Sequence, residues 1–190
     1  MKIENKYTPN FKAKYINSAK IGKYIKDTGT YNGEYVSFVQ IENGNRNDLK
    51  ALEKIARFWE NDKFASNIYY AACCNYNKNS NFSNDTIYAI TEQKNFFNNL
   101  ESGKILGVVH LSPKGDKSTF IEHIQVKPSM IYRIKPSYKG VGTGMINSLK
   151  RMFDKISCIP LREQSVKNFY LKNGFMPSVN DEKCFVWYNA

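Results

Sequence analysis

The sequence lacks any apolar run that approaches the roughly 20 residues needed to cross a bilayer. Its first residues, MKIENKYTPNF, also lack the apolar centre of a secretory signal peptide. We therefore expect a cytoplasmic protein that has no membrane partner. With 190 residues, of which 42% are hydrophobic, the chain is long enough for one domain with a substantial core and somewhat short for two.

Side chains that bind metals tightly are scarce. The chain has four cysteines and two histidines, and none of the cysteines form a Cys-x-x-Cys pair. The adjacent Cys73 and Cys74 are poorly placed to share one tetrahedral site. In a reducing compartment such thiols are usually small buried hydrophobes. We expect no structural metal.

Acidic residues are outnumbered by basic ones, 17 against 28, which gives a net charge of +11. A basic surface is the first sign of phosphate binding. Here, however, the lysines are spread along the chain and accompany abundant asparagine, isoleucine, tyrosine and phenylalanine, as in a genome-wide compositional bias. The charge therefore gives no reason to expect a nucleic-acid partner.

We interpret residues 1–33 as an extension that packs on or near a single domain, which residues 34–190 form. We predict one short helix in the extension, because Ile21, Tyr24 and Ile25 would share a helical face.

Hydrophobic periodicity predicts the elements of the domain. The segment at 65–74 is ambiguous, and we interpret it as a helix; the polar run at 75–85 should be a surface loop. In the strand at 118–127, alternation would place Phe120, Glu122, Ile124 and Val126 on one face and Ile121, His123 and Gln125 on the other. Strands are predicted at 34–42, 86–91, 104–112, 118–127, 156–161 and 183–188, and helices at 48–60, 65–74, 145–153 and 165–174.

Antiparallel strands followed by strand, helix and strand predict an α/β fold of the α+β kind. We expect a mixed, mostly antiparallel central sheet of about six or seven strands, flanked by helices.

Three glycines stand in alternate positions in YKGVGTG, residues 138–144, directly before a predicted helix. Glycines there leave backbone N–H groups free to bind an anion at the positive end of the helix dipole. A Walker loop is excluded, because Gly-Lys-Ser/Thr is absent. A dinucleotide fingerprint fits less well, because its third glycine would fall at Met145, although Glu163 lies where a ribose-binding acid would.

The segment Lys139 to Gly144 resembles the Arg/Gln-x-x-Gly-x-Gly/Ala motif of the GCN5-related N-acetyltransferase (GNAT) superfamily. Ile134, Pro136 and Tyr138 resemble the usual lead-in, and NFYLKNGF at 168–175 resembles the Phe-Tyr-x-Lys-x-Gly-Phe segment near the end of such domains. The resemblance covers roughly residues 85 to 188. A lysine at 139 and a longer connection before the glycines depart from the pattern.

The resemblance implies acetyl transfer from acetyl-coenzyme A (acetyl-CoA) to a small-molecule or protein amine, by direct transfer in a ternary complex and without a metal. Tyr170 would be the general acid and Glu122 the best candidate for the base, with His123 able to share that task. Residues that would bind coenzyme A are Ile124, Val126, Lys139, Gly140, Val141, Gly142, Thr143, Gly144 and Met145, among which the amides of Val141, Gly142, Gly144 and Met145 would face the pyrophosphate. A catalytically silent coenzyme A-binding module, or a basic RNA-binding module on the same fold, is the alternative.

Overall fold

The computed structural model describes residues 13–42, 45–59, 64–76, 84–94, 99–131 and 135–189. Within these residues one nine-stranded sheet runs through the molecule in the order β6-β1-β2-β3-β4-β5-β7-β9-β8. All neighbouring strands are antiparallel except β5 and β7. The strands are β1 Lys14–Ile25, β2 Thr30–Ile41, β3 Thr86–Thr91, β4 Ile105–Pro113, β5 Ser118–Val126, β6 Tyr138–Lys139, β7 Lys155–Cys158, β8 Met176–Pro177 and β9 Phe185–Tyr188.

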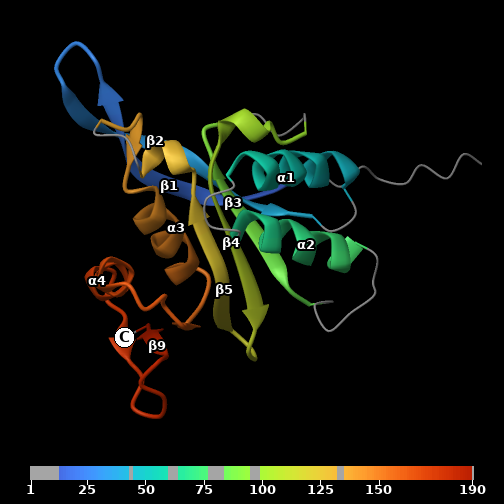
Figure 1. Cartoon of the computed structure of the whole chain (residues 1–190), viewed down its shortest axis with the longest axis vertical. Helices are drawn as coiled ribbons and strands as arrows, with labels where there is room; N and C mark the ends of the chain where they lie inside the picture. Colours follow the sequence, from blue (N-terminus) through green and yellow to red (C-terminus); the bar gives the residue numbers. More distant parts are fainter. Residues whose placement is uncertain are drawn as a thin grey trace, which may run out of the picture.

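Helices cover both faces of this sheet (Figure 1). Each face has its own apolar core: α1 and α2 bury one, and α3 and α4 bury the other. The α-helices are α1 Arg46–Phe58, α2 Phe64–Tyr76, α3 Val141–Lys150 and α4 Gln164–Lys172, and two short 3-10 helices are η2 Ser102–Lys104 and η3 Pro128–Met130. No helix in the described ranges is long and apolar enough to span a membrane.

The mixed, mostly antiparallel sheet flanked by helices is confirmed, and the sheet has more strands than predicted. The helical interpretation of the ambiguous segment at 65–74 is confirmed by α2. The extra strands include β6 and β8, which are each only two residues long and too short to leave a periodic pattern. Most of the polar run at 75–85 lies outside the described residues, as does Ile134.

The short helix predicted in the first part of the chain is wrong, because those residues form β1. Ala19 and Ile21 are buried on either side of the exposed Lys20, which is strand alternation, and β1 pairs with β2 along its whole length. The predicted division of the chain between residues 33 and 34 falls inside β2.

The hairpin of β1 and β2 also supports the segment that precedes the glycines. β6 pairs with β1 through Gly22 and Lys139, and the hydroxyl of Tyr31 on β2 donates a hydrogen bond to the Pro136 carbonyl at 2.9 Å. The N-terminal hairpin therefore fixes the backbone that leads into the glycine turn.

The strand β5 contains a bulge at Glu122. His110 pairs with His123 and Leu111 with Ile121, so Glu122 is an extra residue on the β5 side. A bulge reverses the alternation of side chains beyond it. The prediction of which side chains share a face of β5 is therefore wrong on one side of the bulge. Ile121, predicted on the opposite face, packs in the same core as Ile124 and Val126.

β5 pairs with β7 over only part of its length, and beyond that part the sheet is open on that side. The parallel pairing of these strands ends at Ile121 and Cys158, so the edge of β5 from Glu122 to Val126 has no neighbouring strand on that side among the described residues. Both strands then lead to helices that lie on the same face of the sheet, α3 and α4.

Candidate active site

The glycine turn forms the beginning of α3. Gly140, the residue before the helix, has a left-handed backbone with φ of 75°, and space is open where a side chain would be. A non-glycine residue pays a steric cost in this conformation, which explains the glycine. The first amides of a helix have no partner within it, and Val141, Gly142 and Thr143 occupy these positions. Their N–H groups lie at the positive end of the helix dipole, which is an arrangement that can bind an anion.

Two residues predicted to offer amides to this site do not do so. The amide of Gly144 donates to the carbonyl of Gly140 at 2.8 Å, and Met145 is one residue further into the helix, where the amide bonds to the carbonyl four residues before it. The side chain of Met145 is fully buried. Gly144 lies where a Cβ would be 3.0 Å from Ile21 and 3.3 Å from Ile90. Both residues let α3 pack tightly on the sheet.

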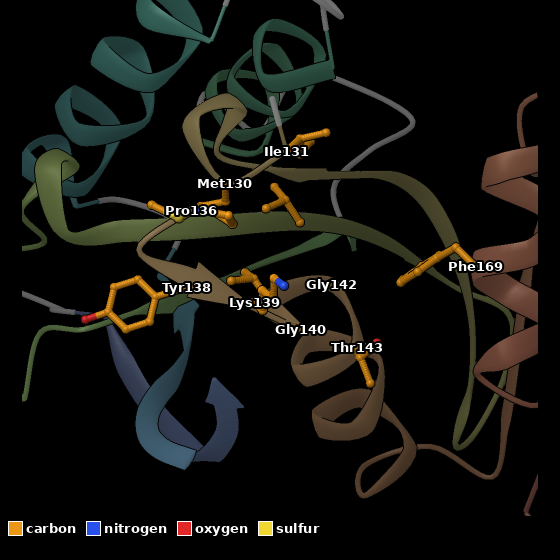
Figure 2. A pocket seen from close by; sticks show the side chains of 11 residues that line it. Met130, Ile131, Pro136, Tyr138, Lys139, Gly140, Gly142, Thr143 and Phe169 are labelled. Carbon is orange, nitrogen blue, oxygen red and sulfur yellow. The ribbon is translucent and has the colours of Figure 1, made fainter. Parts of the chain in front are cut away.

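A cavity of about 400 Å³ lies in front of the free amides (Figure 2). Phe169 reaches it from α4, on the side opposite Lys139, and the ring comes so close to Gly142 that a Cβ there would lie 3.1 Å from two ring carbons. Sequence reasoning did not identify Phe169 as part of the site. An aromatic residue at this position of an amphipathic helix is typical of the core. The cavity is lined by Val126, Met130, Ile131, Pro136, Tyr138, Lys139, Gly140, Val141, Gly142, Thr143 and Phe169.

The two residues of β6 have different environments at the edge of this cavity. The Nζ atom of Lys139 lies 4.3 Å from the centroid of the Tyr31 ring, so its charge is held beside the glycine turn. The ring of Tyr138 points away from Gly142, and its hydroxyl donates to Glu92 Oε2 at 2.7 Å (Figure 2). Burial, and then the neighbouring Glu92, raises the pKa of Tyr138, which keeps the phenol protonated.

The unpaired edge of β5 carries the amides of Ile124 and Val126. The amide of Lys127 donates to Leu106 on β4 at 2.9 Å. Because N–H groups alternate between the two edges of a strand, the amides of Gln125 and His123 face β4 as well, and those of Ile124 and Val126 face the opening. The structure thus brings both predicted residues to the open edge.

A second cavity, of about 640 Å³, follows this edge. It shares Val126, Ile131, Gly142 and Phe169 with the first cavity, so the two cavities adjoin, and together we call them the channel. The remaining lining residues are Phe64, Ile121, Glu122, His123, Ile124, Gln125, Ile159, Pro160, Leu161, Glu163, Ser165, Val166 and Tyr170.

The fold of this chain is similar to that of several solved structures. The complex named AtaTR bound with acetyl-CoA superposes with a TM-score of 0.52 at 14% identity, covering 80% of this chain and 92% of that one. A probable acetyltransferase from Staphylococcus epidermidis gives 0.51 at 13% identity, with 82% and 99% covered. NAA60 from Arabidopsis thaliana in complex with acetyl-CoA gives 0.50 at 14% identity, with 80% and 98% covered. The chain has the GNAT fold. Its sequence matches no protein-family model and no curated protein.

In this GNAT fold Tyr170 lines the second cavity from α4. The side chain is 4% exposed and packs edge-on against Phe169 and Phe175. Burial, and then the neighbouring thiol of Cys158, raises the pKa of Tyr170 well above its usual range. Burial also raises the pKa of Cys158 to about 12. Both groups therefore hold their protons at neutral pH.

The end of α4 explains the NFYLKNGF segment at 168–175. Gly174 adopts a left-handed conformation with φ of 76°, and the side chain of Asn173 donates to the Phe169 carbonyl at 2.8 Å. These contacts end the helix and turn Phe175 into the core, where it is fully buried. The motif thus fixes the last turn of α4, which carries Tyr170.

Three polar residues lie together next to the opening on the α2 side of the sheet. Glu122, the bulged residue, is exposed, and His123 is partly buried; both line the second cavity. Behind them His110 is 2% exposed, and its Nε2 lies 2.7 Å from Asp85 Oδ2. No sequence pattern points to this Asp85–His110 pair, because the two residues are distant in sequence and meet only through the pairing of β3 with β4.

Proposed function

We propose that the protein is an acetyl-CoA-dependent N-acetyltransferase that transfers the acetyl group directly to a primary amine. The observation that carries this proposal is the pair of adjoining cavities. One lies at the first amides of α3, those of Val141, Gly142 and Thr143, the other follows the unpaired edge of β5, and Gly142 and Phe169 line both.

The donor fits the two halves of the channel. The pyrophosphate would bind the free amides, with Lys139 beside it as a charge partner. The pantetheine arm would extend the sheet by pairing with the amides of Ile124 and Val126, as an added strand does. Solved neighbours named as bound to acetyl-CoA support this donor.

Tyr170 is the proposed general acid. When the tetrahedral intermediate collapses, the sulfur of coenzyme A needs a proton, and a phenol with a raised pKa is still protonated at that moment. The phenol lines the cavity next to the open edge where the thioester would lie.

The acceptor is an amine that arrives as a cation. Although the whole chain is basic, the charged side chains among the described lining residues of the second cavity are Glu122 and Glu163, both acidic. This local field favours an ammonium group, contrary to the acidic acceptor that the overall charge suggests. An ammonium must lose a proton before it can attack, and Glu122 and His123 both line the cavity and could accept it.

The proposal is tested first by binding. Thermal unfolding should shift upward with acetyl-CoA and with coenzyme A but not with NAD; a ligand at about 100 times its dissociation constant adds about 2.7 kcal/mol. The absence of a shift with both coenzyme A compounds would exclude an enzyme and a coenzyme A module together.

Turnover is the second test. A panel of polyamines, amino acids and peptides is incubated with acetyl-CoA, and release of free thiol is followed. We expect thiol release with a cationic primary amine. A thermal shift without release on any acceptor would favour the catalytically silent module.

A further inference from the structure

Four polar side chains form a continuous chain that starts in the protein interior, passes through His123, which lines the second cavity, and ends at Asn67 on α2. Asp85 Oδ2 lies 2.7 Å from His110 Nε2, and His110 Nδ1 lies 3.4 Å from His123 Nδ1. His123 Nε2 lies 3.2 Å from the Asn67 amide nitrogen on α2. The two imidazole rings are nearly parallel, at 7°, because β4 and β5 pair His110 directly with His123.

When both histidines are neutral, this chain allows one arrangement of their protons. Asp85 is an acceptor when ionised, so the proton of neutral His110 lies on Nε2 and its Nδ1 is an acceptor. The proton of neutral His123 must then lie on Nδ1, where it donates to His110. His123 Nε2 is consequently an unprotonated nitrogen, and the Asn67 amide donates to it.

We propose that His123 is the catalytic residue that takes the net proton from the acceptor amine, and that His110 and Asp85 are positioning residues that hold His123 in the required tautomer. This inference rests on the proposed function above. Glu122, the exposed neighbour of His123, would instead hold the incoming ammonium.

The protons balance. An ammonium and a thioester give an amide, a thiol and one free proton. His123 Nε2 takes that proton from the ammonium, directly or through one water, in place of the hydrogen bond that it accepts from Asn67, and becomes an imidazolium whose Nδ1–H still donates to His110. The neutral amine attacks the thioester carbon. Tyr170 gives its proton to the sulfur as the carbon–sulfur bond breaks. The amine nitrogen then loses its second proton, and this proton restores the phenol of Tyr170.

The groups around His123 suit this task. His110 faces it from β4, Glu122 adjoins it on β5, and Phe64 and Asn67 face it from α2. Burial, and then the proximity of His110, lowers the pKa of His123, whereas Glu122 opposes this effect. His123 is therefore neutral and able to accept a proton at neutral pH.

The tautomers can be measured without any substrate. The chain contains only two histidines, so a ¹⁵N-labelled protein gives two imidazole spin systems, which the variants His110→Gln and His123→Gln assign. We expect the Nε2–H form for His110 and the Nδ1–H form for His123 at pH 7.5. A His123 found as the Nε2–H form would overturn the proposed chain, whether or not the protein turns over.

Kinetics test the role in catalysis. With the amine found in the thiol-release panel, His123→Gln should lower kcat about 100-fold and leave the thermal shift by acetyl-CoA unchanged. Asp85→Asn and His110→Gln should lower kcat at least about 10-fold and move the acidic limb of the pH profile. Glu122→Gln should mainly raise KM for the amine.

Failure of this inference can be told apart from failure of the proposed function. If wild type releases thiol but His123→Gln does so at the wild-type rate, His123 is not the base and the proposed function stands. A loss of kcat in Glu122→Gln alone would assign the proton to Glu122. No thermal shift and no turnover by wild type would overturn the proposed function and the role of His123 with it.

Discussion

The ring of Phe169 lies against the backbone of Gly142, where a Cβ would be only 3.1 Å from two ring carbons. This contact joins α4 to the first turn of α3 and forms the wall shared by the two cavities. We expect Gly142→Val to displace the ring and narrow the channel, lowering the affinity for acetyl-CoA by about 10-fold or more, which is about 1.4 kcal/mol. Isothermal titration measures this change.

Gly103 offers a matched control for that substitution. No atom of the described residues lies within 4 Å of the position that a Cβ on Gly103 would take. The residue lies in η2 and lines neither cavity. Gly103→Val should leave acetyl-CoA affinity unchanged. Equal affinities for wild type and Gly142→Val would show that the pyrophosphate and pantetheine do not pass this wall.

Removing the hydroxyl of Tyr170 should slow the chemical step without changing the binding of acetyl-CoA. Tyr170→Phe keeps the buried ring and its contacts with Phe169 and Phe175 but removes the proposed proton donor. We expect kcat to fall about 100-fold while the dissociation constant for acetyl-CoA stays nearly constant. Tyr188→Phe, at an exposed position on β9, is the control. An unchanged kcat would mean that the sulfur receives its proton elsewhere.

The hairpin of β1 and β2 should influence acetyl-CoA binding without lining the channel. Tyr31 donates to the Pro136 carbonyl and holds the Lys139 charge over its ring. Tyr31→Leu removes both contacts, so we expect the affinity for acetyl-CoA to fall a few-fold, since each such contact is worth about 0.5–1.5 kcal/mol. Tyr35→Leu, exposed on the same strand, should have no effect, and the same titration compares the two.

The lowered pKa of His123 predicts a pH dependence of stability. The unfolded state binds a proton at this residue with a pKa of about 6.5, whereas the folded state binds it only at lower pH. Between these two pKa values the unfolded state holds more protons, so the free energy of unfolding rises as the pH rises. Urea unfolding of wild type and of His123→Gln, at several pH values below about 6.5, should show a smaller slope for the variant. Identical slopes would contradict the prediction.

The sequence predicted most of the domain because its strands and helices are long and strongly periodic. It also drew attention to the turn before α3, because alternate glycines leave backbone N–H groups accessible at the beginning of a helix. It did not predict β1, where Ile21 and Tyr24 fit a helical spacing as well as a strand; the pairing with β2 decides between them. Such long-range pairing leaves no local signal.

Two features of the site follow from a single extra residue. The bulge at Glu122 cannot be read from alternation, since it is the place where alternation fails. It puts His123 opposite His110 and turns Ile121 toward the α3 core, so neither the faces of β5 nor the His110–His123 contact could be predicted from the sequence.

The pairing of β1 with β6 has a consequence for synthesis of the chain. β1 leaves the ribosome well before its neighbour β6, which emerges only after β2 to β5 and the first two helices. Contacts between segments so far apart in sequence form late, because a long loop must be closed first. The glycine turn therefore acquires its final shape only after Lys139 has been made, and a nascent chain stalled before that point lacks the proposed donor site.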